Sequence, residues 1–265
     1  MKKVLTVAGS DSGGGAGIQA DLKTFAALRV YGTSAITAVT AQNTSRVAGV
    51  HTLPAEFVAG QVEAIVEDIG IDALKTGMLA NSDIIRAVAK VIRRFDLRPL
   101  IIDPVMVAQS GDALMEKEAI TALLQDLLPL AAIVTPNLDE AAILADRDVK
   151  SLNDMKSAAK VIHTYGPDWV LIKGGHMDSS TVTDLLYDGK EFYKFSSPRL
   201  QVTNTHGSGC TYAAAITAML SRIASVPEAV EKARAYLLAA LEEGLDIGKG
   251  SGPLHHFVHY YREWP

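Results

Sequence analysis

Residues 204–212 combine groups that are suited to binding a phosphate. A polar loop that contains two glycines runs directly into a long stretch of small, helix-favouring residues. The first N–H groups of a helix have no partners within it and carry partial positive charge, so this junction is expected to bind an anion. Glycine at two positions permits close approach of backbone to ligand or a positive φ. The expected donors are Gly207, Ser208, Gly209 and Cys210.

Cys210 is the only cysteine of the chain and lies at this junction. A helix N-terminus favours the thiolate, so its pKa is expected near or below the ordinary value of about 8.5, and the thiolate would accept a proton from an attacking alcohol. The alternative is that the thiol is a small buried apolar group. A nucleophile elbow is excluded, because its second glycine would fall at position 212, where the chain has Tyr212.

A second glycine-rich stretch, Gly9–Gly17, follows the first apolar run. It matches neither standard phosphate loop: Gly15 stands where a P-loop has lysine, and no register gives G-x-G-x-x-G. The stretch still suits a loop that approaches a ligand closely. Asp21, shortly after it, is either a first-turn acid favoured by the helix dipole or a ligand contact.

Several other polar or flexible side chains follow apolar runs. Gln42 both donates and accepts, so it can pair with the amine and the adjacent ring nitrogen of an aminopyrimidine, or it can simply cap a strand end. Met78 and Val105 can enclose a flat ring or belong to the core. Asp103 follows a buried run and needs a cation or a donor.

Asn137 and Glu140 have the spacing of a helix capping box. The alternative is that they hold Mg²⁺, directly or through water, since this ion prefers oxygen ligands. Lys173, followed by two glycines, suits a polyphosphate. Zinc is disfavoured, because His255, His256 and His259 lack a Glu-x-x frame and a cysteine partner.

Short β-branched runs alternate with longer amphipathic segments, which predicts an α/β fold with a mainly parallel sheet in one domain, 1–265. Asp188-Gly189 predicts the turn of a late hairpin. Ligands bind outside the carboxyl ends of such strands. The predicted strands are 3–8, 34–40, 72–75, 99–103, 131–135, 168–173, 181–187 and 191–196, and the predicted helices are 17–29, 54–68, 81–95, 115–127, 137–145, 153–164, 209–222 and 226–243.

Composition narrows the class of partner. The chain of 265 residues has a net charge of −5 and no basic run, which argues against nucleic acid as a partner. The apolar run after Met1 is too short for a signal peptide, and no stretch approaches the roughly 20 apolar residues of a membrane span. A soluble, cytoplasmic protein that binds small molecules is the simplest expectation.

Together these segments resemble the ribokinase-type small-molecule kinases, and specifically the hydroxymethylpyrimidine/phosphomethylpyrimidine kinases of thiamine biosynthesis. The resemblance covers nearly the whole chain. It rests on residues 8–21, 39–44, 75–79, 103–106, 135–137 with Glu140, 173–176 and 205–211.

The resemblance implies a ribokinase-like three-layer α/β/α sandwich that is typically a homodimer. It implies transfer of phosphate from ATP, with Mg²⁺, to 4-amino-5-hydroxymethyl-2-methylpyrimidine and then to its monophosphate. Cys210 would accept the alcohol proton above the anion hole formed by Gly207, Ser208 and Gly209. The pyrimidine would contact Gly9, Asp21, Gln42, Met78 and Val105; the nucleotide would contact Asn137, Lys173 and Thr205; and the metal would be held by Glu140 and Asp103.

Two departures and two alternatives accompany the resemblance. Gln109 stands where relatives often have lysine, which bears on the second transfer, and residues 250–256 differ from the usual ending. A pyridoxal or pyridoxine kinase on the same scaffold is the nearer alternative, and Gln42 argues against it because relatives that act on pyridines tend to have an apolar residue there. A nucleotide-binding sensor without turnover is the other alternative, but it leaves Cys210 and Glu140 unused.

Overall fold

A single β-sheet forms the centre of the protein in the computed structural model, which describes residues 1–106, 115–175 and 180–261. Within these residues nine strands are joined in the order β3-β2-β1-β4-β5-β6-β7-β8-β9. The strands are β1 (Lys3–Asp11), β2 (Tyr31–Gln42), β3 (Val47–Thr52), β4 (Ala73–Thr76), β5 (Leu100–Ile102), β6 (Ile133–Val134), β7 (Trp169–Ile172), β8 (Thr181–Tyr187) and β9 (Phe192–Pro198).

The central strands are parallel and the outer ones antiparallel. β2, β1, β4, β5, β6 and β7 pair in parallel, whereas β3 and the β8–β9 hairpin pair in antiparallel fashion. Every residue of β4, β5 and β6 is buried, as expected for strands that are covered on both faces. The predicted mainly parallel α/β sheet is therefore confirmed.

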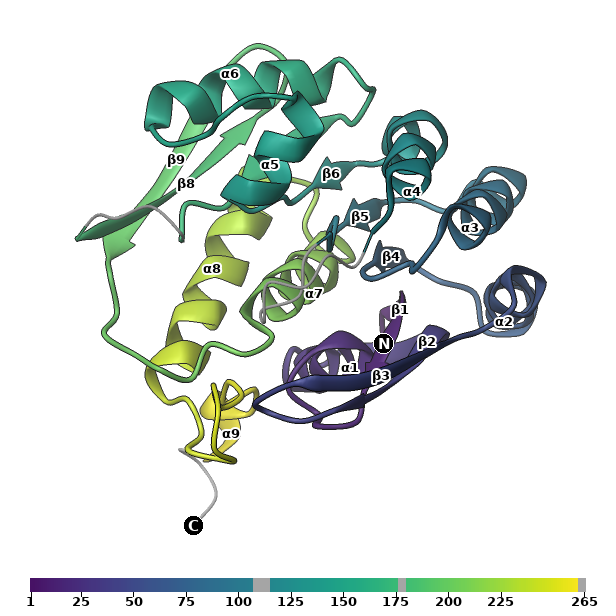
Figure 1. Ribbon diagram of the computed structural model, residues 1–265, viewed down its shortest axis with the longest axis horizontal. Helices are drawn as coiled ribbons and strands as arrows, with labels where there is room; N and C mark the ends of the chain where they lie inside the picture. The colour runs from purple at the N-terminus through teal and green to yellow at the C-terminus, as the bar shows by residue number, and fades with distance from the viewer. Residues whose placement is uncertain (107–114, 176–179, 262–265) are drawn as a thin grey trace.

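Helices cover both faces of the sheet (Figure 1). One face packs against α1, α7 and α8 around Phe25, Ile216 and Tyr236. The other face packs against α2 to α6 in the larger hydrophobic core. Among the described helices, none is both long enough and apolar enough to cross a bilayer. The helices are α1 (Gly17–Ala27), α2 (Ala55–Asp68), α3 (Ser82–Phe95), α4 (Lys117–Ala122), α5 (Leu138–Ala145), α6 (Leu152–His163), α7 (Ser208–Leu220), α8 (Val226–Glu242) and α9 (Val258–Tyr261).

Two segments differ from the sequence-based prediction. β3 has no predicted counterpart, because five of its six residues are exposed and its apolar residues do not alternate clearly with polar ones. The sequence predicts one helix over 115–127, but the α-helical part, α4, ends at Ala122. A π turn, Leu123–Leu127, follows it, and then a short 3₁₀ turn that contains Pro129. Pro129 has no backbone N–H to donate, so a regular α-helix cannot continue through this position.

The predicted hairpin turn at Asp188-Gly189 is confirmed. Gly189 has φ +91°, a conformation that favours glycine. The Asp188 carboxylate accepts the N–H groups of Lys190 and Glu191 at 2.7 and 2.6 Å, which closes the turn between β8 and β9.

Candidate active site

A cavity of about 670 Å³ lies at the carboxyl ends of the parallel strands. This is the edge at which ligands bind in open α/β sheets. The predicted site residues that line it are Gly9, Gln42, Met78, Asp103, Val105, Asn137, Glu140, Lys173, Thr205, Gly207, Ser208, Gly209 and Cys210. The fold thus brings together side chains from segments that are as far apart in sequence as β1 and α7.

The loop before α7 has the geometry of an anion site. Gly207 is the N-cap of α7 with φ +83°, and a Cβ at this position would overlap the carbonyl oxygen of Gly15. Position 207 therefore requires glycine. Gly209 has no such strain: a Cβ there would meet Lys173 Nζ at 3.4 Å, an ordinary contact. The Ser208 N–H already donates to Thr205 O at 3.2 Å, which leaves Gly209 and Cys210 as the better-placed donors of the first turn.

The thiol of Cys210 lines the cavity but is not acidified. Burial raises its pKa to about 11, against the opposing effect of Lys75, and the carboxylates of Asp103 and Asp21 raise it further. The sequence-based expectation of a pKa near or below 8.5 was therefore wrong. Burial of the thiol, with the two carboxylates, outweighs the effect expected of the helix N-terminus.

Asp21 does not line the cavity among the described residues. It lies beyond the first turn of α1, fully buried, and accepts bonds from Lys75 Nζ at 2.9 and 3.1 Å and from Thr6 Oγ1 at 2.6 Å. Asp21 is therefore neither a first-turn acid nor a residue of the cavity wall, the two roles that the sequence suggested. It forms a buried ion pair with Lys75. Burial lowers the pKa of Lys75, but Asp21, together with Cys210 and Asp103, outweighs burial and raises this pKa above its ordinary value.

Two carboxylates and one ammonium group meet at the end of β5. Lys173 Nζ donates to Asp103 Oδ1 at 3.0 Å. Asn137 and Glu140 form the predicted capping box of α5, with bonds of 2.9 and 2.8 Å. Burial raises the pKa of Glu140 to about 7, Lys173 opposes this rise, and Asp103 adds to it.

The same pair of carboxylates fits a hard divalent cation. Asp103 and Glu140 are 2% and 4% exposed, and one lysine balances only one of their charges. The described residues contain no group of three acidic, histidine or cysteine side chains around a common point. A Mg²⁺ ion here would complete its shell with water and phosphate oxygens, which is usual for this metal.

A row of polar contacts joins Gln42 to His206 and Asp11, for which the sequence predicts no role. The Gln42 amide nitrogen lies 3.5 Å from His206 Nε2, which lies 3.0 Å from the Asp11 carboxylate. Asp11 also accepts the N–H groups of Gly13, Gly15 and Ala16. Burial opposes ionisation of Asp11, but the His206 contact and these N–H groups lower its pKa.

The apolar end of the cavity was not predicted from the sequence. Leu237, Leu238 and Leu241 of α8 line it, together with residues that follow β9. Nearby, the Arg234 side chain donates to Asp184 Oδ2 at 3.0 Å and to Ser197 Oγ at 2.8 Å. A helical apolar stripe predicts burial but not whether protein or ligand covers it, so this wall is visible only in the fold.

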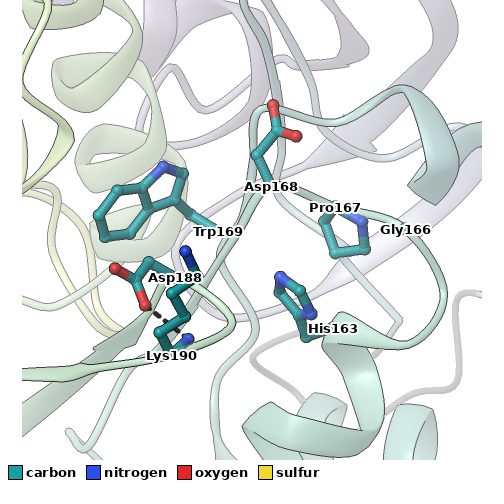
Figure 2. Close-up of a pocket in the computed structure, with 7 residues that line it drawn as sticks. All are labelled: His163, Gly166, Pro167, Asp168, Trp169, Asp188 and Lys190. Carbon is teal, nitrogen blue, oxygen red and sulfur yellow. Dashed lines mark hydrogen bonds between the residues drawn. The ribbon is translucent and has the colours of Figure 1, made fainter.

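A second cavity, of about 450 Å³, lies at the amino end of β7 (Figure 2). His163, Pro167 and Trp169 line it, and the Asp188–Lys190 turn closes one side. It contains none of the predicted site residues. Gln109 and His176 lie outside the described residues.

Comparison with known proteins identifies the family. A model of the family described as phosphomethylpyrimidine kinase matches residues 11–255. The chain belongs to the phosphomethylpyrimidine kinase family. The hydroxymethylpyrimidine/phosphomethylpyrimidine kinase of Rhizobium meliloti is 48% identical over 98% of both chains.

Two further similar proteins carry different names. The thiamine biosynthesis bifunctional protein ThiED of Geobacter sulfurreducens is 46% identical over 96% of this chain and 52% of its own length. The crystal structure of an ADP complex of Bacillus subtilis pyridoxal kinase is 41% identical, covers 98% of this chain and 99% of its own, and superposes with a TM-score of 0.92. The ribokinase-like fold is therefore shared by kinases named for two different substrates.

Proposed function

We propose that this kinase transfers phosphate from ATP to the hydroxymethyl group of 4-amino-5-hydroxymethyl-2-methylpyrimidine, and then to the resulting monophosphate, in thiamine biosynthesis. The observation that carries the proposal is that Gln42 and Cys210, which are far apart in the sequence, line the same cavity. Gln42 offers a donor and an acceptor to an aminopyrimidine edge, and Cys210 offers a proton acceptor at the start of α7. The substrate is supported by two relatives, one named hydroxymethylpyrimidine/phosphomethylpyrimidine kinase and one named thiamine biosynthesis bifunctional protein.

In this proposal the protein acts by positioning and by electrostatics. Met78 and Val105 hold the ring, and Gly9 lets it approach β1. As the hydroxyl oxygen attacks the γ-phosphorus, its proton passes to the Cys210 thiolate, the bond from phosphorus to the leaving oxygen breaks, and ADP leaves. N–H groups of Gly209 and Cys210 stabilise the charge on the phosphoryl group. No phosphoenzyme is required.

The nucleotide is proposed to lie between Asn137, Lys173 and Thr205, which share the cavity with the apolar wall of α8. Asp103 and Glu140 would hold Mg²⁺, which when bound neutralises phosphate charge. The relative solved with ADP supports a nucleotide on this scaffold. A homodimer in the cytoplasm completes the proposal.

Pyridoxal is the second candidate substrate, because the B. subtilis pyridoxal kinase has nearly the same fold. An assay of ADP release with ATP and Mg²⁺, run on the aminopyrimidine and on pyridoxal, separates the two. We expect a higher kcat/KM for the aminopyrimidine and turnover that requires Mg²⁺.

Gln42→Met serves as the matched variant in this assay. It should weaken the aminopyrimidine by about 1–3 kcal/mol, because a matched donor and acceptor are lost, while the KM for ATP changes little. A preference of the wild type for pyridoxal, or an unchanged KM for the aminopyrimidine in Gln42→Met, contradicts the proposed substrate.

A further inference from the structure

A strap of residues 244–253, between α8 and α9, contacts two of the segments that form the cavity. One is the turn between β2 and β3, residues 43–46, and the other is the loop before α7, residues 203–207. None of the strap residues, all of which the structure describes, lines the cavity. The strap therefore has no part in the proposed function so far.

Thr44 joins the strap to the β2–β3 turn. Its Oγ1 accepts the N–H groups of Lys249 and Gly250, both at 3.2 Å. The backbones approach so closely here that a Cβ on Gly250 would overlap the carbonyl oxygen of Thr44, and a Cβ on Gly248 would overlap its Oγ1. Glycine at both positions lets the strap lie directly on the turn.

Ser251 joins the strap to the loop before α7. Its Oγ donates to Thr203 O at 3.0 Å and accepts the Thr205 N–H at 3.2 Å. Ser251 directly follows Gly250 in the chain, so neighbouring strap residues bind the two segments. So short a stretch of backbone has little freedom to absorb a displacement of one segment relative to the other, and we expect movement of the turn to reach the loop.

Gly252 adds a second pair of bonds to the same loop. Its N–H donates to the side-chain oxygen of Asn204 at 3.1 Å, and its carbonyl oxygen accepts the His206 N–H at 3.1 Å. Thr205 and His206 line the cavity, and Gly207, which follows them, is the N-cap of α7. The strap thus fixes the backbone that comes directly before the anion hole.

The β2–β3 turn is equally close to the cavity. Gln42 ends β2 and Val47 begins β3, and both residues line the cavity. The turn between them is braced from within, because the Asn43 side chain accepts the N–H groups of Ser45 and Arg46 at 2.9 and 3.0 Å. A shift of this turn is therefore expected to move the lining residues that it connects.

We infer that the strap sets the position of the β2–β3 turn relative to the loop before α7, with Thr44, Ser251 and Asn204 as positioning residues. This inference rests on the proposed function, in which Gln42 binds the pyrimidine and the start of α7 binds the transferred phosphoryl group. Transfer requires these two groups to be aligned, and a displacement of about 1 Å can cost about 100-fold in rate. The strap acts through the two segments that it joins.

Thr44→Val tests the strap, because valine keeps the shape of threonine but offers no oxygen to the two strap N–H groups. With the aminopyrimidine alcohol, kcat should fall about 10- to 100-fold while the KM for ATP changes little. Thr44→Ser, which keeps the oxygen, should retain the kcat of the wild type. Gly49→Ala in β3 is the matched control and should also retain it, since a Cβ there meets no atom within 4 Å.

Ser251→Ala releases the strap at its other contact. If the strap is one connection, the double variant Thr44→Val/Ser251→Ala should lose no more kcat than the more damaged single variant, because either change already breaks the connection. Losses that multiply would mean that the two residues act independently, and they would overturn the inference. A kcat equal to that of the wild type in Thr44→Val would overturn it as well.

Hydrogen exchange followed by NMR gives a readout that does not depend on turnover. In Thr44→Val the amide of His206 should exchange faster than in the wild type, although its bonded partner is Gly252. In Gly49→Ala its exchange should not change. Unchanged exchange of this amide in Thr44→Val refutes the coupling. Failure of the wild type to phosphorylate the aminopyrimidine refutes the proposed function, whereas the exchange result still tests the strap itself.

Discussion

At the scale of single residues, Cys210 shows how burial changes the role that a sequence suggests. A thiol at a helix start is expected to ionise easily, but here burial among Asp103 and Asp21 raises its pKa to about 11. A thiol with such a pKa is mostly protonated at neutral pH, and its thiolate is a strong base when it forms. If Cys210 is the general base, turnover is therefore limited by the fraction of thiolate.

This gives a prediction for pH dependence. Below a pKa of about 11 the thiolate fraction rises about tenfold per pH unit, so kcat of the wild type should increase between pH 7 and 9. Cys210→Asp should lose this increase, because a carboxylate is already ionised. Cys210→Ala should lower kcat by about 10²–10⁴-fold while ATP still binds. Steady-state kinetics over this range provides the measurement.

Two outcomes would count against the role. If Cys210→Ala retains full activity, the thiol has only a packing role. A phosphorylated cysteine trapped in the wild type would make it a nucleophile rather than a base. Cys210→Asp is the matched control, since it retains a proton acceptor at the same position.

At the scale of helices and strands, the sequence predicts the site better than the ends of the elements. Polar residues after apolar runs, such as Gln42 and Asp103, are recognisable because a parallel sheet gathers its carboxyl ends at one edge. The capping box of Asn137 and Glu140 is likewise local, and both of its bonds are present. Edge strand β3 was missed, because exposed strands lack a clear pattern.

Side-chain contacts between elements that lie far apart in the chain could not be predicted from the sequence. Asp21 on α1 pairs with Lys75 on β4, and neither residue indicates its partner, because the pairing depends on how α1 packs against the sheet. For the same reason the Asp11–His206 contact, which joins β1 to the loop before α7, was not predicted.

The Asp21–Lys75 pair gives a prediction for stability. Both side chains are fully buried, so Lys75→Met would leave Asp21 without its counter-charge. Removal of one partner of a buried pair typically costs about 3–5 kcal/mol. Urea denaturation should show a loss of this size in the free energy of unfolding.

The double variant Lys75→Met/Asp21→Asn is the control for this pair. It removes both charges, keeps a polar group near Thr6, and should recover most of the lost stability. A loss below about 1 kcal/mol in Lys75→Met alone would mean that the pair contributes little.

At the scale of the whole molecule, the C-terminal segment is fastened to the helix that carries the site. His256 is buried, its Nε2 lies 3.0 Å from Thr211 Oγ1, and its carbonyl oxygen accepts from Tyr236 OH at 2.7 Å. Thr211 follows Cys210 directly on α7, and Tyr236 belongs to α8. His256 thus connects α7 to α8 through one side-chain and one backbone contact.

This connection makes the stability of the fold sensitive to acid. Burial lowers the pKa of His256 to about 4, and Lys23 and His255 lower it further, whereas an unfolded histidine titrates near 6.5. Between these values the unfolded chain binds a proton that the folded chain excludes, so the free energy of unfolding should fall by up to about 1.4 kcal/mol per pH unit from pH 6.5 to 4. Glu140 has the opposite effect, because its pKa is raised to about 7 in the fold.

Comparison of wild type with His256→Gln isolates the histidine from Glu140 and from other groups. Glutamine keeps a hydrogen-bonding group toward Thr211 but does not titrate, so the difference in unfolding free energy between the two proteins should shrink as the pH falls from 6.5 to 4. Chemical denaturation at half-unit steps of pH measures this difference. A constant difference across the range would mean that His256 takes up its proton equally well in both states, and that the segment is not held by a neutral histidine.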